Sequence, residues 1–104
     1  MATTTKVLAR TAAATSNTTL YTVPNTSTTT VVSNIAVCNT AASSATFTLN
    51  IDGVAIQSGS SVAANTTAYI DLKQVIPANA TPKTISGSAS ATTVNFHISG
   101  VEIS

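Results

Sequence analysis

Charged side chains are scarce in this chain of 104 residues. Asp, Glu, Lys and Arg together make up 7% of the sequence, against about 25% in ordinary proteins, and the net charge is +1. The four basic residues are scattered, so they form no basic stripe that could neutralise a row of phosphates. No run approaches the roughly 18 continuous apolar residues of a membrane span. We therefore expect neither nucleic acid nor a membrane as a partner.

Cysteine and aromatic residues are also few. Cys38 is the single cysteine, which excludes an intrachain disulfide, and the aromatic residues are two Phe, two Tyr and no Trp. The core must therefore be built from Val, Ile and Leu and will be thin, so neighbouring subunits are expected to help stabilise the fold. Residues 1–5 read as a short polar arm, and the Thr-rich start predicts a protein made in the cytoplasm without a signal peptide.

Apolar and β-branched runs of strand length recur along the whole chain. Turn-forming residues separate them at spacings of about eight to twelve residues, and no window has the period of an amphipathic helix. The runs cover residues 6–12, 18–23, 29–39, 45–51, 54–57, 66–76, 84–89 and 93–103. They predict a single all-β domain over residues 1–104: an antiparallel β-sandwich of about eight strands, jelly-roll-like or Ig-like.

Two local patterns refine this prediction. Asp52-Gly53 lies between two apolar runs and predicts a hairpin with a type I′ turn, followed by a small-residue loop at residues 58–65. In the last run, Val94, Phe96 and Ile98 alternate with polar residues until Gly100, after which the apolar positions resume one step out of phase. An extra residue at Gly100 would be a β-bulge that bends the strand.

The residue types that carry chemistry do not form a recognisable motif. His97 should be partly exposed, because it alternates with the apolar positions, and Cys38 lies in a strand-like run where a buried structural thiol is expected. The other potential ligands, Asp52, Asp71 and Glu102, are far apart in sequence. We therefore expect no catalytic, cofactor-binding or metal site, no small-molecule substrate and no enzyme activity.

A carbohydrate-binding β-sandwich is the main alternative from another functional class. Such modules stack sugars on exposed aromatic rings, and Tyr69 is the one residue placed for this, since it alternates with Ala68 and Ile70 and should lie on the outer face. An isolated Tyr on a strand is more often a packing or interface residue.

Three segments together resemble a known family. They are Leu20 to Pro24 (LYTVP), Val31 to Thr40 (VVSNIAVCNT) and Val94 to Ile103 (VNFHISGVEI). In this order and spacing they resemble the small β-sandwich virion proteins of tailed bacteriophages, including head decoration (cement) proteins of cyanophage type. Many members carry Ala-Gly after the first segment, where this chain has Asn25-Thr26.

The resemblance implies a non-enzymatic virion protein on the capsid surface. It implies a decoration protein that binds the major capsid protein, stabilises the shell and forms a homotrimer. A tail or neck component of the virion, or a host-surface glycan-binding module, are the alternatives. The scarcity of charge is compatible with repeated lateral packing, since strand edges with few charges would otherwise risk edge-to-edge aggregation.

Overall fold

The computed structural model describes residues 2–104, which form nine β-strands. None of its described residues belongs to a helix long and apolar enough to cross a membrane. The strands are β1 (Thr3–Ala12), β2 (Thr18–Thr22), β3 (Thr29–Asn39), β4 (Ala45–Ile51), β5 (Val54–Val62), β6 (Thr66–Ile70), β7 (Gln74–Ile76), β8 (Thr84–Ala89) and β9 (Val94–Ile103).

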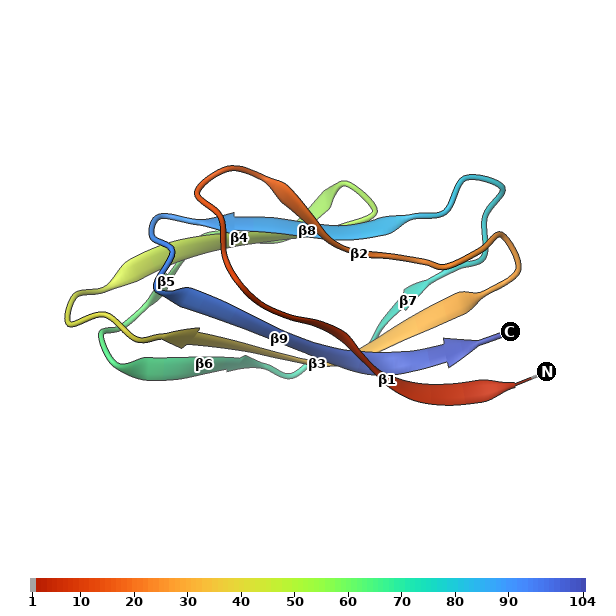
Figure 1. Ribbon diagram of the computed structural model, residues 1–104, viewed down its shortest axis with the longest axis horizontal. Coiled ribbons are helices and arrows are strands. Elements are labelled where there is room, and N and C mark those ends of the chain that lie inside the picture. Colours follow the sequence, from red (N-terminus) through yellow and green to blue (C-terminus); the bar gives the residue numbers. More distant parts are fainter. Residues whose placement is uncertain (1) are drawn as a thin grey trace.

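The strands form two stacked antiparallel sheets, which confirms the predicted β-sandwich (Figure 1). Sheet A has the order β1-β9-β3-β6, with β7 also paired to β3, and sheet B has the order β2-β8-β4-β5. Successive strands mostly cross from one sheet to the other, so the two halves interlock. This is the strand order of a jelly roll, one of the two topologies that the sequence leaves open.

The core lies between the sheets and is built mainly from aliphatic side chains. Phe47, Leu49 and Ile51 of β4 are buried and face the buried Phe96 and Ile98 of β9. The rings of Phe47 and Phe96 pack edge to face, with centroids 6.3 Å apart and an interplanar angle of 66°. This arrangement is favourable for aromatic pairs and joins the two sheets at the middle of the core.

A buried asparagine fixes one end of the sandwich. Asn39, at the end of β3, has no exposed surface. Its Nδ2 donates to the carbonyls of Ser43 at 2.8 Å and Val62 at 3.3 Å, and its Oδ1 accepts from the Ala41 N–H at 3.1 Å. Because a buried amide must be hydrogen-bonded, these contacts tie the end of β3 to the β3–β4 loop and to β5.

The predicted Asp52-Gly53 hairpin is confirmed. Both residues have positive φ, 57° and 74°, and Ile51 pairs with Val54 across the two-residue turn. The predicted loop at residues 58–65 is partly wrong, because β5 continues to Val62. Gly59, with φ of 60°, forms a bulge that lets the small residues resume pairing with β4.

Two other boundaries differ from the prediction. Residues 66–76 are not one strand, because the pairing with β3 shifts by one residue and residues 71–73 stay unpaired between β6 and β7. Of the predicted arm, residue 1 lies outside the described residues, and Thr3–Thr5 belong to β1 instead of forming an arm. Ala2 is also paired, since it exchanges backbone hydrogen bonds of 2.7 and 2.9 Å with Ser104.

The predicted bulge at Gly100 is wrong, because β9 is the regular strand and its neighbours carry the extra residues. The register shifts between Val7 and Ala9 in β1, and between Val32 and Asn34 in β3. Gly100 is buried, and a Cβ there would lie 2.2 Å from the Val31 carbonyl oxygen. The glycine therefore permits close approach of two backbones. The inward alternation of β9 continues through Gly100 to Glu102.

Candidate functional site

The outer face of sheet A collects the candidate residues of the sequence. We call it the A face. Cross-strand pairing places Arg10, His97, Ala36 and Tyr69 in one row, and Cys38 in the next row beside Asn95 and Thr67. His97 is exposed, as predicted, and Tyr69 is 74% exposed on the outer face, also as predicted.

Cys38 differs from its prediction. The side chain is half-buried on the A face and does not belong to the core. The reason is the alternation of β3, in which Val37 and Asn39 take the inward positions on either side of it. The thiol is therefore a surface group of a strand and not a structural core residue.

The acidic candidates lie away from His97 and Cys38. Asp52 is in the β4–β5 turn and pairs with Lys83 at 3.4 Å, Asp71 is exposed between β6 and β7, and Glu102 faces the interior. Within residues 2–104, no three His, Cys, Asp or Glu side chains come close enough to hold a metal ion. The row on the A face thus brings a guanidinium, an imidazole and a phenol near one another without a carboxylate partner.

The other end of the A face is apolar. Cross-strand pairing aligns Thr5, Val101, Val31 and Val75 across β1, β9, β3 and β7. Val75 is 59% exposed, and Val7 of β1 is 44% exposed nearby. The three valines align apolar side chains across β9, β3 and β7, with Thr5 beside them on β1, and such a row is more informative than single exposed residues.

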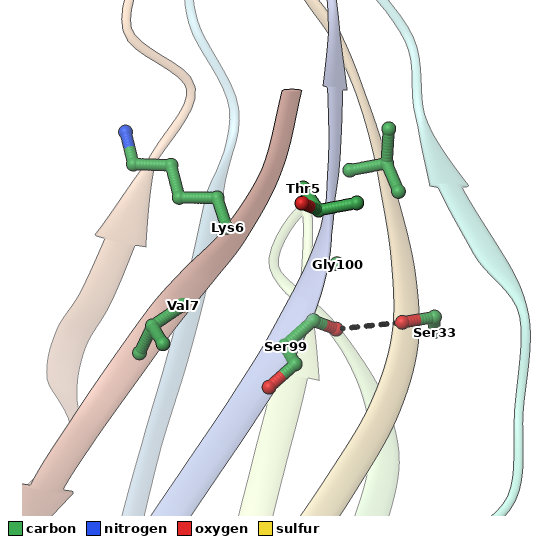
Figure 2. A pocket seen from close by; sticks show the side chains of 7 residues that line it. Thr5, Lys6, Val7, Ser33, Ser99 and Gly100 are labelled. Carbon is green, nitrogen blue, oxygen red and sulfur yellow. Dashed lines mark hydrogen bonds between the residues drawn. The ribbon is translucent and has the colours of Figure 1, made fainter. Parts of the chain in front are cut away.

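A shallow depression of about 400 Å³ lies on this face where β1 and β3 bulge on either side of β9 (Figure 2). Thr5, Val7, Ser99 and Val101 are among the residues that line it. The Ser33 hydroxyl donates to the Ser99 carbonyl at 3.2 Å and closes one side. The depression is open and has a mixed apolar and hydroxyl lining, which fits surface contact better than enclosure of a small ligand.

A partly buried polar cluster joins the two sheets at the end where the chain termini lie. The Tyr21 hydroxyl of β2 donates to Glu102 Oε2 at 2.5 Å and lies 2.8 Å from the Thr30 hydroxyl. Lys6 Nζ lies 3.3 Å from both carboxylate oxygens of Glu102. The cluster therefore links strands of both sheets through one carboxylate.

This environment keeps the Tyr21 phenol protonated. Burial and the hydrogen bond to the Glu102 carboxylate raise the pKa of Tyr21 to about 12. A phenol with a raised pKa is a hydrogen-bond donor and a poor nucleophile. The role that fits this cluster is therefore structural: its hydrogen bonds hold the two sheets together. The cluster was not predicted, because a bulge at Gly100 would have turned Glu102 outward. Uninterrupted alternation from Val94 to Glu102 was the signal that could have found it.

The outer face of sheet B has a different character. Most of its strand residues carry uncharged hydroxyl or amide groups, among them Thr19, Thr48, Asn50, Ser86 and Ser88, and Ala55 is an apolar exception. The exposed Val54 belongs to the β4–β5 hairpin at the edge. The sandwich is therefore two-sided, with a polar uncharged face on sheet B and a partly apolar face on sheet A.

Comparison with known proteins gives a likeness of fold only. No family model and no curated protein matches the sequence. A chain of the T13 particle of IBDV, an icosahedral virus, has a similar fold, with a TM-score of 0.56 and 14% identity over 97% of the present chain. A chain of the infectious bursal disease virus Gx strain gives a TM-score of 0.49 and 15% identity. The present chain spans 30% of the length of each of these chains.

Proposed function

We propose that this chain is a non-enzymatic structural component of a virion, and specifically a capsid decoration (cement) protein. The observation that carries the proposal is the two-sided sandwich, with an apolar row of Val101, Val31 and Val75 on the A face. Jelly rolls are common in viral capsid proteins, and the fold likeness to a chain of an icosahedral virus particle agrees with that setting.

The mechanism is mechanical. The A face packs on the major capsid protein of the expanded shell, and the uncharged outer face of sheet B is turned to solvent. The apolar row supplies most of the favourable free energy of the contact. Apolar area removed from water contributes about 25 cal/mol per Å² before the costs of association. Each copy adds a modest free energy, and many copies together resist rupture of the shell.

The first test concerns particles. Virions that lack this protein should assemble with normal geometry but release their DNA at lower temperature than complete virions, and addition of purified protein should restore them. If depleted particles are equally robust and host adsorption fails instead, the tail component or the glycan-binding module replaces the decoration protein. Imaging of complete particles would locate the chain on the shell or on the tail.

The second test concerns the A face. Val75→Asp places a charge in the apolar row at an exposed position, so the fold should survive while binding to the capsid falls at least tenfold. Val54→Asp is the matched control, because Val54 is 67% exposed but lies on the hairpin of sheet B. Equal binding by the two variants would exclude the A face as the contact surface. His97→Ala should leave capsid binding within a factor of two if no chemistry is involved.

A further inference from the structure

The edges of the two sheets differ in how well they are protected against pairing with another strand. Among the described residues, β2 has five residues, β5 has two irregularities, and the β6–β7 edge is interrupted at residues 71–73. Short strands, bulges and interruptions prevent edge-to-edge association. β1 has ten residues, lacks proline and is regular from Thr3 to Val7. It is the longest edge strand among the described residues, and its single bulge, between Val7 and Ala9, leaves the segment before it uninterrupted.

The one charge in this part of β1 is already neutralised. A lysine on an edge strand normally repels an incoming strand. Lys6, however, lies 3.3 Å from both oxygens of Glu102, whose carboxylate also accepts from Tyr21. The ion pair balances the charge that would otherwise repel an incoming strand.

The backbone groups on this edge can be assigned from the ladder. Ala2 and Ser104 exchange N–H to C=O bonds in both directions. In an antiparallel ladder, such pairs alternate with pairs whose backbone groups point away from the partner strand. The N–H and C=O groups of Thr3, Thr5 and Val7 therefore point away from β9, toward the free edge.

We propose that residues 3–7 of β1 pair antiparallel with the same segment of a second copy of this chain, about a twofold axis at Thr5. Thr5 then faces the Thr5 of the second copy, and Thr3 faces its Val7. All the outward backbone groups of the three residues find partners in this register. The two A sheets become one continuous sheet across the axis.

The segment is complementary to itself more than to an arbitrary strand. The three residues whose backbone groups point to the free edge, Thr3, Thr5 and Val7, are spaced evenly about Thr5. The bulge between Val7 and Ala9 ends the regular edge on one side. Lys6 faces Thr4 of the second copy, so the two lysines are not opposed. Facing Thr pairs are favourable across strands, and the exposed Val7 is covered by a Thr side chain. The contact requires no capsid, so it holds whether or not the proposed function does.

Cysteine cross-linking tests the register, in a Cys38→Ser background. Facing residues of a hydrogen-bonded pair have Cα atoms about 5.5 Å apart, which a disulfide can bridge. We expect Thr5→Cys to form a covalent dimer on mild oxidation. Thr3→Cys is the matched control on the same face of the same strand, because the two Thr3 positions would lie about 13 Å apart along the strand. Equal cross-linking of the two variants, or none at Thr5→Cys, would overturn the proposal.

A backbone substitution tests the hydrogen bonds. Thr5→Pro removes an outward N–H and breaks no bond to β9, whereas Thr5→Ser keeps the N–H. In analytical ultracentrifugation we expect the molar mass of wild type and of Thr5→Ser to be twice that of Thr5→Pro. The circular dichroism spectra of the three proteins should be equal, which would show that the fold is kept. Hydrogen exchange of the wild type gives a measurement without mutation: the Thr3, Thr5 and Val7 amides should be protected to the same degree as those of Thr4 and Lys6. Fast exchange of the three amides, or equal masses, would refute the twofold contact without affecting the virion proposal.

Discussion

Truncation of Phe47 is the most direct test of the core. The side chain is 3% exposed and its ring packs edge to face on Phe96 of the other sheet. Loss of the buried ring and formation of a cavity should cost about 3–5 kcal/mol in Phe47→Ala. The aromatic pair accounts for about 0.5–1.5 kcal/mol of this. Because domains of this size have a total stability of about 5–15 kcal/mol, the variant should be close to unfolding.

Urea denaturation followed by circular dichroism measures the effect. Thr46→Ala is the matched control, since Thr46 is exposed on the outer face of the same strand. Its free energy of unfolding should stay within about 0.5 kcal/mol of the wild-type value. Thr48→Ala should fall between the two, at about 0.5–1.5 kcal/mol, because Thr48 Oγ1 accepts from the Gly59 N–H at 3.2 Å. Equal midpoint shifts for Phe47→Ala and Thr46→Ala would show that the assignment of inner and outer faces is wrong.

Three further predictions concern the polar cluster, the close backbone contact and the buried amide. Tyr21→Phe should cost about 1–3 kcal/mol, because the Glu102 carboxylate loses a donor. In wild type the contribution of this phenol is fully present below pH 10 and is lost as pH rises toward its folded pKa of about 12, so only wild type should show this alkaline loss in denaturation series. A parallel loss in both proteins would contradict this. Gly100→Ala should cost about 1–3 kcal/mol or more, since the new Cβ would lie 2.2 Å from the Val31 carbonyl oxygen, and an unchanged melting temperature would refute the close approach. Asn39→Ala should cost about 1–3 kcal/mol for each buried group left without a partner, measured in urea, and a neutral result would mean that water replaces the amide.

Local sequence pattern was sufficient for the central strands. The predicted bounds of Thr29–Asn39, Ala45–Ile51 and Thr84–Ala89 match the structure. The runs Thr29–Asn39 and Ala45–Ile51 are rich in β-branched or aromatic residues. The second also alternates strictly between apolar and polar residues, so strand propensity and burial agree there. The Asp52-Gly53 turn was predictable for a similar reason, since positive φ limits the choice of residues.

The features that were not predicted depend on which strands lie beside each other in the sheets. Residues 58–62 have the composition of a loop, yet they form a strand because β4 supplies the ladder and Gly59 allows a bulge. The bulges of β1 and β3 could not be located from β9 alone. Once they are assigned to the neighbours, Glu102 turns inward and Val101 outward, which creates both the polar cluster and the apolar row.

The candidate site was predictable residue by residue but not as a surface. Alternation placed His97 and Tyr69 on outer positions, and both are exposed. Their common row with Arg10 depends on the order of strands in sheet A, which brings together residues far apart in the chain. No local pattern contains that order, because it follows from how the whole chain packs.

The position of β9 has a consequence for the kinetics of folding. β9 lies between β1 and β3 in sheet A, although it is the last of the described strands to be synthesised (Figure 1). β1 therefore has no neighbour in the sheet until residues 94–103 have left the ribosome, and most contacts of sheet A are distant in sequence. Such topologies fold in milliseconds to seconds. During that interval the free edges of β1 and β3 are open to other nascent chains, so the rate of β9 insertion should determine the yield of folded protein at high expression.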